Sequence, residues 1–431
     1  MVDLEKNQKN KAKVQLTRIG RFRLQSDIQF FTYGCKGFIL VFLSIFSTIA
    51  CSRVAGNVVT ATQPIGDLKT IETEPIIRRT SSPIEPIEPK FIDPIKLAWF
   101  YKPPTNNDLG HLAANYQLFI LTKLDEEVRD QLIQHHGVTE PVLRYVRFDA
   151  IMDPGSCLDQ PYRNQVADEI GDFCRISAQH PDWFLLDEEG QRIRNDDGDF
   201  YLMDPGNQGW REFWLQRVLK NQAALGWEGL FLDNVEAGFS KRNRSNRLPA
   251  RYESEEEYQL AIRDFLKMIY EKYSHPTQSP LFANVLSEDV PDGLLSYLPY
   301  LDGVMLEGFA VDWHSGYRTT EEWENQLEVI ETVLQTNTHV LMVAKGDEVD
   351  DDRQRFAFAS YLLVTNGNSS FRYVLTDRTD EEIYFDNYDY DLGQPLGLRI
   401  WDDGYWIRNF QNGVVRVDSE KHEAEIWSQY Q

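Results

Sequence analysis

The chain has few basic residues, and this shortage limits the partners that it can bind. Its 431 residues include 44 Lys and Arg against 68 Asp and Glu, which gives a formal net charge of −24. Residues 1–51 hold 8 of the basic and 3 of the acidic residues, so the remainder holds 36 against 65, or −29. Such a surface repels nucleic acid and anionic lipid headgroups, although an acidic surface also serves solubility in general. We therefore expect no nucleic-acid partner.

The spaced ligands of the common metal motifs are also missing. No cluster of His, Cys, Asp and Glu has the spacing of a zinc site. The Asp-rich stretch at residues 195–199 lacks the spacing and the final glutamate of an EF-hand loop, which favours a solvated turn. We therefore expect neither a metal nor a cofactor, with a divalent cation at an Asp-rich rim as an alternative.

No apolar run reaches the roughly 20 residues of a bilayer span. Residues 37–50 (GFILVFLSIFSTIA) match the apolar region of a signal peptide and follow a basic segment. The run leads into STIAC at residues 47–51, which resembles the lipobox of bacterial lipoproteins, where the cysteine is acylated. We expect residues 1–51 to be an export leader with a lipid anchor at Cys51, the only membrane contact, which places the protein in the bacterial cell envelope or periplasm. An uncleaved anchor and a leader cut by ordinary signal peptidase are the alternatives.

Residues 52–94 lack the pattern of a helix or a strand. They include prolines at positions 83, 86, 89 and 94. Proline in this rhythm removes backbone donors and favours an extended chain. We interpret this segment as a linker between the leader and the body of the protein.

Cysteine is scarce, with four in the whole chain. Cys35 and Cys51 lie in the leader, so only Cys157 and Cys174 belong to the body. A disulfide between these two is one interpretation, and two buried thiols are the other.

Short apolar runs alternate with amphipathic stretches from residue 95 onward, which indicates alternating strands and helices. Helices are expected at residues 125–136, 252–273, 320–336 and 352–364, the second opening with a capping box of Ser254 and Glu257. A closed parallel barrel requires eight strands, so we predict an α/β fold, a (β/α)8 TIM barrel over residues 95–391. The eight predicted strands are residues 96–101, 117–122, 142–148, 230–233, 281–285, 303–307, 339–344 and 370–374.

Two segments fall outside this rhythm. More than eighty residues separate the third strand from the fourth, and we expect this insertion to lie over the barrel mouth because it connects a strand to a helix. Within it, residues 180–190 suggest a strand entering a glycine turn, and a helix is expected at residues 210–225. Residues 392–431 contain alternating apolar positions around a turn at Asn412 and Gly413, which predicts a small antiparallel β appendage.

Polar side chains follow most of the predicted strands, at the end of the barrel where active sites form. Asp233 ends the fourth strand and Glu307 the sixth, so the two carboxylates can meet one ligand from opposite sides. Two carboxyls in different environments are what glycoside cleavage requires. The alternatives are that Asp233 caps a turn and that Glu307 forms a structural ion pair with Lys345. The full set of strand ends is Tyr101 and Lys102, Thr122, Arg147 and Asp149, Asp233 and Asn234, Asn284, Glu307, Lys345 and Arg372.

An ordered set of motifs adds a family resemblance. DWFLLDEEG at 182–190, YLMDPGNQGWR at 201–211, GLFLDN at 229–234, LGQPLG at 392–397 and RNFQNGVV at 408–415 resemble the TIM-barrel glycosyl hydrolases related to endo-α-1,4-polygalactosaminidases. The resemblance spans about residues 96–418. It implies action on a polysaccharide, with Asp233 as nucleophile and Glu307 as acid/base. The segment Arg416-Val417-Asp418 departs from the family pattern, which often has Asn-Pro after the last valine.

We therefore predict an exported glycoside hydrolase of retaining mechanism that acts on a polysaccharide or oligosaccharide. The alternative is a surface-anchored carbohydrate-binding barrel without turnover, because the fold alone does not imply catalysis. Asp204 is expected to be a turn residue or helix cap, and Glu236 and Gly238 are expected to be loop residues that leave the site. The remaining rim residues receive supporting roles beside structural ones: Asn234 and Asn284 bind hydroxyls, Arg147, Asp149 and Lys345 orient the carboxylates, and Tyr101, Trp313 or Trp183 stack on a sugar ring.

Overall fold

The computed structural model describes residues 93–106, 108–195, 198–238, 248–286, 291–312, 316–376 and 378–429. These residues belong to one compact unit, Pro83–Gln431. The predicted leader, its anchor at Cys51, nearly all of the linker, and Trp313 lie outside the described residues. Among the described residues, no helix has the length and apolar character needed to cross a membrane.

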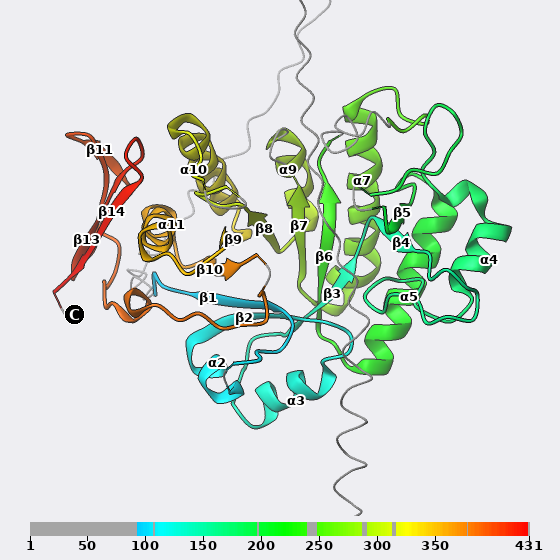
Figure 1. The fold of residues 1–431 in the computed structure, drawn as a ribbon, viewed down its shortest axis with the longest axis horizontal. Coiled ribbons are helices and arrows are strands. Elements are labelled where there is room, and N and C mark those ends of the chain that lie inside the picture. The colour runs from blue at the N-terminus through cyan, green and yellow to red at the C-terminus, as the bar shows by residue number, and fades with distance from the viewer. Residues whose placement is uncertain are drawn as a thin grey trace, which may run out of the picture. The chain divides into compact units, whose positions relative to one another are not determined.

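Eight parallel strands close into a barrel, with helices packed around it (Figure 1). Each of the eight predicted strands is confirmed, and the predicted TIM barrel with it. Parallel strands buried on both faces need continuous apolar runs, which is why the runs were legible in the sequence. In barrel order the strands are β1 (Leu97–Tyr101), β10 (Ser369–Leu375), β9 (His339–Gly346), β8 (Gly303–Glu307), β7 (Leu281–Leu286), β6 (Gly229–Glu236), β3 (Leu143–Arg147) and β2 (Tyr116–Leu121).

Two separate cores result from the alternation of side chains along these strands. Every second residue faces the lumen, and the others face the surrounding helices. The luminal core is a small cluster of its own, distinct from the large outer core. Its members include Tyr145, Phe231, Phe282, Met305 and Val343. On five strands the residue two positions further on is polar: Arg147, Asp233, Asn284, Glu307 and Lys345.

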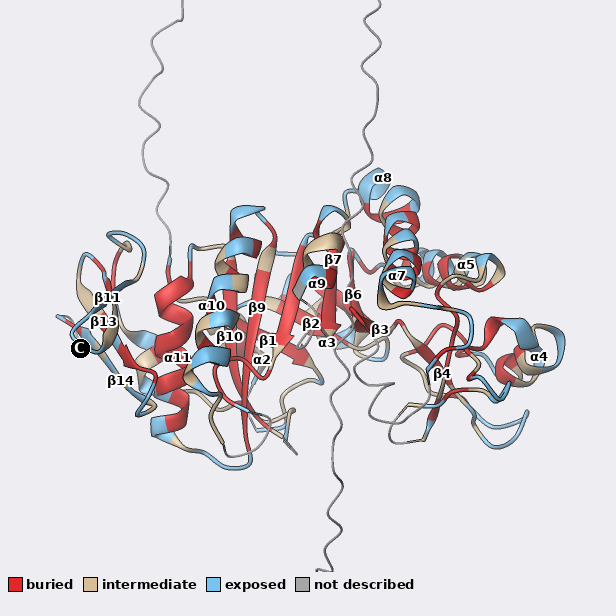
Figure 2. Ribbon diagram, turned by 90° about the horizontal axis from the view of Figure 1, so that it is seen from above, coloured by how far each residue is buried: buried red, intermediate tan, exposed pale blue. Residues whose placement is uncertain are grey.

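The predicted helices form, and α11 is buried along most of its length (Figure 2). They are α3 (Glu126–Gln134), α5 (Gln208–Leu225), α7 (Glu255–Ile269), α10 (Thr320–Gln335) and α11 (Asp351–Val364). Ser254 Oγ accepts from Glu257 N at 3.3 Å, but the Glu257 carboxylate accepts from Glu253 N at 3.0 Å, so this cap is half of the predicted box. A complete capping box stands at the start of α10, between Thr319 and Glu322. The short helices α2 (Leu109–Asn115), α8 (His275–Thr277) and α9 (Pro291–Tyr297) were not predicted from the sequence.

The insertion between β3 and β6 packs beside the barrel. Its strands β4 (Ala150–Met152) and β5 (Phe200–Leu202) pair antiparallel, and the disulfide Cys157–Cys174 ties the start of helix α4 (Asp172–Gln179) to the preceding loop. The strand expected at residues 180–190 is wrong in its first part, because a 3-10 turn, Pro181–Trp183, occupies it and only isolated bridges follow. Proline at the first helical position explains this turn.

A four-stranded antiparallel sheet forms the predicted C-terminal appendage, on the opposite side of the barrel from the insertion (Figure 1). Its strands are β11 (Ile400–Asp402), β12 (Tyr405–Asn409), β13 (Gly413–Asp418) and β14 (Glu423–Ser428). The sheet packs on α11 through Val415 and Val417, both fully buried. Arg408 joins the two layers, because its guanidinium donates to Leu362 O at 2.9 Å and Thr365 O at 2.7 Å at the end of α11.

Candidate active site

Asp233 reaches the lumen at a β-bulge in β6. The register between β6 and β7 runs from Leu232 opposite Ala283 to Val235 opposite Val285, so β6 has one extra residue there. Asn234 has a φ of 60°, the left-handed conformation that asparagine tolerates better than most residues. Bulges of this kind re-aim side chains beside active sites. Here Asp233 continues the luminal face of Phe231, whereas the next apolar residue, Val235, belongs to the outer core.

Three side chains donate hydrogen bonds to the Asp233 carboxylate. Tyr145 Oη lies 2.5 Å from Oδ2, Asn284 Nδ2 3.1 Å from Oδ1, and Asn234 Nδ2 3.4 Å from Oδ2. Burial, and after it the charge of Asp233, raises the pKa of Tyr145 well above its usual value, so the phenol keeps its proton and donates. The carboxylate is thus held in one orientation by neighbours on β3, β6 and β7.

Glu307 ends β8, with a side chain 15% exposed. Burial raises the pKa of this carboxyl, the Lys345 ammonium opposes that shift, and the negative charge of Asp233 adds to it. Lys345 Nζ donates to Glu307 Oε1 at 3.3 Å from the neighbouring strand β9. Burial likewise lowers the pKa of Lys345. Glu307 is therefore disposed to hold a proton beside an Asp233 that only accepts hydrogen bonds.

Asn284 lies between the two carboxylates on the intervening strand β7. It donates to Asp233 and also lies close enough to Glu307 to act against the rise in that pKa. Its Oδ1 is buried and has no hydrogen-bond partner among the described residues. A buried amide oxygen left without a donor is costly, so it is suited to accept from a ligand hydroxyl.

Aromatic rings form the opposite wall of the mouth. Tyr101 packs edge-on against Tyr145 with ring centroids 5.2 Å apart, and Tyr162 of the insertion lies close to both phenols. The backbone of Tyr101 has a φ of 79°, a strained value for an aromatic residue. Burial raises its pKa well above the usual value, and the hydroxyl meets Met305 Sδ at 3.8 Å. Tyr101 thus lies at the site, as a ring rather than as a hydrogen-bond donor to the carboxylates.

Arg147 and Asp149 pair with each other rather than with the two carboxylates. Arg147 Nε lies 2.9 Å from Asp149 Oδ1, and its guanidinium lies 3.9 Å from the centre of the Phe200 ring. Their backbones also form hydrogen bonds within the insertion. Arg147 N donates to Asn164 O at 2.7 Å, and Met203 N donates to Asp149 O at 2.9 Å. This pair is placed to fix the insertion against β3.

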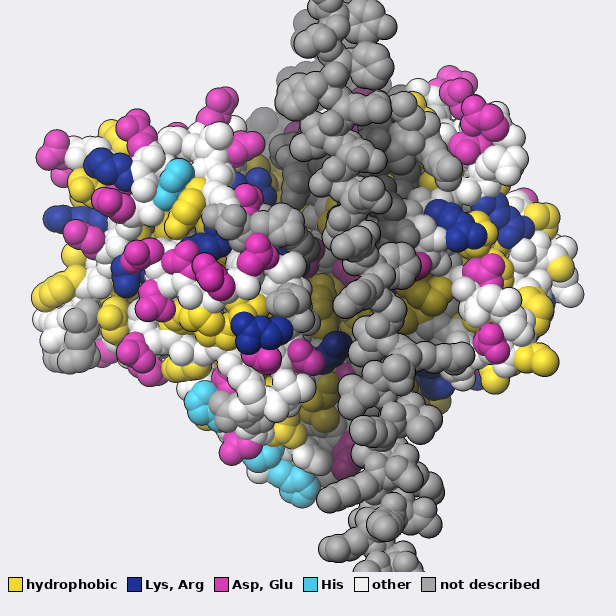
Figure 3. Space-filling model, viewed as in Figure 1, with side chains coloured by type: hydrophobic (Ala, Val, Ile, Leu, Met, Phe, Trp, Pro, Cys, Tyr) yellow, Lys and Arg dark blue, Asp and Glu magenta, His cyan; other side chains and the backbone are white. Residues whose placement is uncertain are grey.

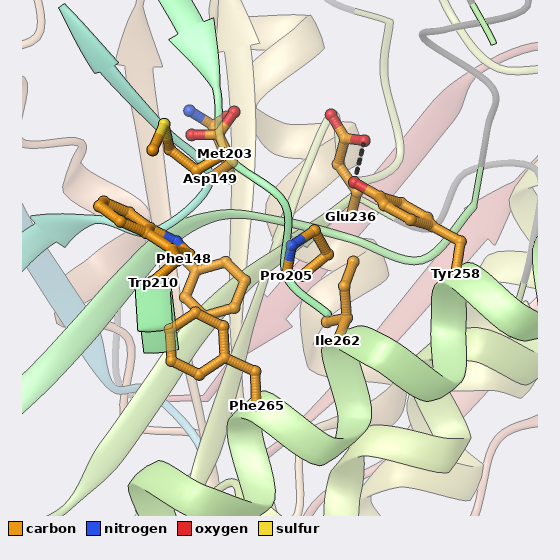
Figure 4. A pocket seen from close by; sticks show the side chains of 10 residues that line it. Phe148, Asp149, Met203, Pro205, Trp210, Glu236, Tyr258, Ile262 and Phe265 are labelled. Atoms are coloured by element: carbon orange, nitrogen blue, oxygen red, sulfur yellow. Dashed lines mark hydrogen bonds between the residues drawn. The ribbon is translucent and has the colours of Figure 1, made fainter. Parts of the chain in front are cut away.

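A small pocket lies behind the bulge, outside the barrel, between β6 and helices α5 and α7 (Figure 4). Asn234 and Glu236 line it together with Asp149 and apolar side chains, around a cavity of about 10 Å³. The interpretation of Glu236 as a loop residue leaving the site is wrong. It is the last residue of β6, is 4% exposed, and accepts a hydrogen bond from Tyr258 Oη at 3.3 Å.

Several other candidates have structural roles. Trp183 is 8% exposed and stacks on His180 at 4.0 Å, so its ring is not free for a sugar. Asp204 accepts from Gly206 N at 2.8 Å and from Tyr252 Oη at 2.5 Å, in agreement with a turn residue. Arg372 donates to Phe100 O at 3.0 Å and Thr379 O at 2.6 Å. In the part of the chain that the structure describes, no group of three or more His, Cys, Asp and Glu could hold a metal ion.

Tyr145 and Tyr162 are site residues that the sequence did not reveal. Tyr145 lies inside a predicted strand, two positions before Arg147 and therefore on the same face, so the period-2 pattern was its only signal. Tyr162 lies in the irregular part of the insertion, where no periodic signal exists.

The comparison with protein families decides the class of the protein. The model of hypothetical glycosyl hydrolase family 15 matches residues 158–414. This chain belongs to that family. Membership makes it an enzyme of the glycoside hydrolase class, and the matched residues include both carboxylates. No curated protein is significantly similar to the chain.

Solved structures of sugar-active enzymes are similar to this family member. A noncanonic maltogenic α-amylase from Thermotoga neapolitana matches at 12% identity and a TM-score of 0.45, over 74% of this chain and 84% of that one. An α-amylase from Geobacillus thermoleovorans matches at 11% and 0.42, over 75% and 86%. A dextranase from Flavobacterium johnsoniae matches at 12% and 0.41, over 65% and 36%. At these scores the matches add nothing about substrate.

Proposed function

We propose that the protein is an exported retaining glycoside hydrolase in which Asp233 is the nucleophile and Glu307 the acid/base. The observation that carries this proposal is the difference between the two carboxyls. Asp233 is surrounded by three donors, whereas Glu307 is buried beside a negative charge that raises its pKa. Pairs of carboxyls in such unequal environments divide the roles of nucleophile and acid.

The reaction then runs in two steps. Asp233 Oδ attacks the anomeric carbon while Glu307 gives its proton to the glycosidic oxygen, which leaves with the aglycone. Ester formation removes the charge of Asp233, so one cause of the raised pKa of Glu307 disappears and Lys345 stabilises the carboxylate. Glu307 then takes a proton from water, which attacks the anomeric carbon and frees Asp233.

Substrate and location extend this proposal. The acidic surface fits a neutral or cationic polysaccharide, and the relation to polygalactosaminidases remains a prediction on this point. Export to the cell envelope is supported by the disulfide Cys157–Cys174, because disulfides persist in oxidising compartments.

The test is release of reducing sugar from a panel of bacterial exopolysaccharides by the full chain. We expect Asp233→Asn and Glu307→Gln to lose activity by about 10²- to 10⁴-fold or more, the usual contribution of such groups. The matched control is Glu140→Gln, an exposed carboxylate in the loop between α3 and β3. For a retaining mechanism, NMR should show that the first-formed product has the same anomeric configuration as the cleaved bond of the substrate. Binding by all variants with release by none, wild type included, would instead identify a carbohydrate-binding protein without turnover.

A further inference from the structure

A second concavity, which we name the Tyr317 groove, lies between the N-terminus of α11 and one end of the C-terminal sheet. Its volume is about 520 Å³, within the range of ligand sites in proteins. The side chains that matter for its chemistry are Tyr317, Asp352, Arg355, Tyr405, Lys421 and His422.

Segments that follow the carboxyl ends of β8 and β9, the end of the barrel that carries the two carboxylates, line part of the groove. Tyr317 belongs to the loop that leaves β8 after Glu307, and α11 begins after the carboxyl end of β9. The turn between β13 and β14 reaches this loop, because His422 stacks on Tyr317 and Thr320 Oγ1 donates to Ser419 O at 3.2 Å. The C-terminal sheet therefore contacts a segment that leaves the carboxyl end of the barrel.

One buried side chain connects the groove to the candidate active site. Arg353 is 2% exposed, and its Nε donates to Lys345 O at 2.9 Å. The same guanidinium donates to Asp312 O at 3.0 Å and to Gly316 O, in the loop that carries Tyr317. The wall of the groove is thus fixed to the strand that presents Lys345 to Glu307.

The chemistry of the groove fits a neutral ligand that is rich in hydroxyls. Tyr317 and His422 stack with ring centroids 4.4 Å apart, and Tyr405 adds a third, half-exposed ring. Both cations are paired with carboxylates, since Arg355 pairs with Asp352 at 2.7 Å and Lys421 with Asp418 at 2.6 Å. Two further carboxylates, Glu423 and Glu425, also line the groove. Acidic, basic and hydrophobic side chains are likewise mixed over this side of the molecule (Figure 3). Aromatic faces beside charged hydrogen-bonding groups suit a pyranose chain, whereas a polyanion meets an excess of negative charge.

We propose that the Tyr317 groove binds sugar units of the substrate chain that lie beyond the cleaved bond. The inference rests on the proposed function, because it assigns a neutral polysaccharide as the substrate and gives the enzyme a second point of attachment to it. An enzyme with such a site acts on long chains in preference to short ones.

Affinity gel electrophoresis tests the binding directly. The full chain with Asp233→Asn is run in gels containing dextran, soluble starch or galactomannan, with alginate as the anionic comparison. The double variant Tyr405→Ser/His422→Asn removes two rings, and asparagine tolerates the φ of 57° at position 422. The control Trp427→Ser removes an aromatic ring that is 55% exposed on the same sheet but does not line the groove.

We expect at least one neutral polysaccharide to retard the protein, and the double variant to weaken this by roughly three- to tenfold while the control does not. Tyr405→Ser alone, a single change at a strand end, should show part of the loss if the double variant is unstable. Equal retardation of the double variant and the control would overturn the proposal. So would retardation by alginate alone, or by none of the four.

Hydrolysis separates this inference from the proposed function. If the wild type cleaves a neutral glycan, the ratio of kcat/KM for the polymer to that for a trisaccharide should fall in the double variant and stay constant in Trp427→Ser. Cleavage with an unchanged ratio would support the hydrolase and contradict a role of the groove in binding substrate. Retardation that depends on the groove, without cleavage by the wild type, would support the groove as a binding site and contradict the hydrolase.

Discussion

The two halves of the barrel mouth differ in what they present. Strands β6 to β9 present Asp233, Asn284, Glu307 and Lys345 at or near their carboxyl ends, and these side chains contact one another across adjacent strands. On the other half, Arg372 is held by backbone carbonyls and Arg147 by Asp149. Tyr101 presents an aromatic ring there, and Thr122 N donates to Asp125 in its own loop. The comparison indicates that a polar residue at a strand end is available for catalysis where its partners are the polar residues of neighbouring strand ends.

The charge on Arg372 illustrates how the second half is satisfied. Burial lowers the pKa of its guanidinium to about 10. The guanidinium lies 4.0 Å from the centre of the Trp99 ring and donates to two carbonyls. Its bonds join β10 to β1 and to the loop after β10, so its contribution is to stability. We call β6 to β9 the polar arc and the remaining strands the supporting arc.

Tyr145 crosses this division, and its removal should give the largest effect among the supporting residues. Tyr145→Phe deletes the donor at 2.5 Å from Asp233 Oδ2. A hydrogen bond to a charged group contributes about 1.5 to 3 kcal/mol, so kcat/KM should fall by roughly 10- to 100-fold. The matched control is Tyr101→Phe, whose hydroxyl meets only the Met305 sulfur among its described contacts. Equal losses in the two variants would contradict a special role for Tyr145.

Within the polar arc, the role of Lys345 can be tested through the pH dependence of kcat/KM. Its ammonium lowers the pKa of Glu307, so Lys345→Met should raise that pKa further. Glu307 acts as an acid in its protonated form, and activity is lost as pH rises through its pKa. The basic limb of the kcat/KM profile should therefore move to higher pH in the variant.

The control for Lys345 comes from the supporting arc. Arg372→Lys keeps a cation but loses the forked donation to Phe100 O and Thr379 O. We expect Arg372→Lys to lower the melting temperature and to leave the basic limb of the kcat/KM pH profile where it is in the wild type. A limb that shifts equally in both variants would show that the two arcs are not electrostatically distinct.

Much of this arrangement was predictable from the sequence, for a physical reason. Strands buried on both faces are apolar without a break, so their ends are visible as the first polar residue, as at Asp233 and Glu307. The bulge at Asn234 was not visible, because no local pattern distinguishes one extra residue. The bond from Arg372 to Phe100 O and the burial of Trp183 also could not be predicted, since both depend on segments distant in the chain. Glu236 was misinterpreted because the bulge extends β6 beyond its apolar run.

The smallest expected effect on catalysis concerns the insertion, which contacts the supporting arc. Lys123 after β2 pairs with Asp168, and Arg147 N donates to Asn164 O.

Replacing both Cys157 and Cys174 by serine removes a crosslink over a separation of 17 residues and should lower the free energy of unfolding by about 2 to 4 kcal/mol. Denaturant unfolding measures this loss, and a reducing agent should add nothing in the variant. The hydrogen bonds that hold Asp233 and Glu307 come from strands of the barrel and none of them from the insertion. We therefore expect kcat/KM, at a temperature where the variant is folded, to change by less than about threefold. A larger loss in the folded variant would mean that the insertion shapes the polar arc, and that the two halves of the mouth are not independent.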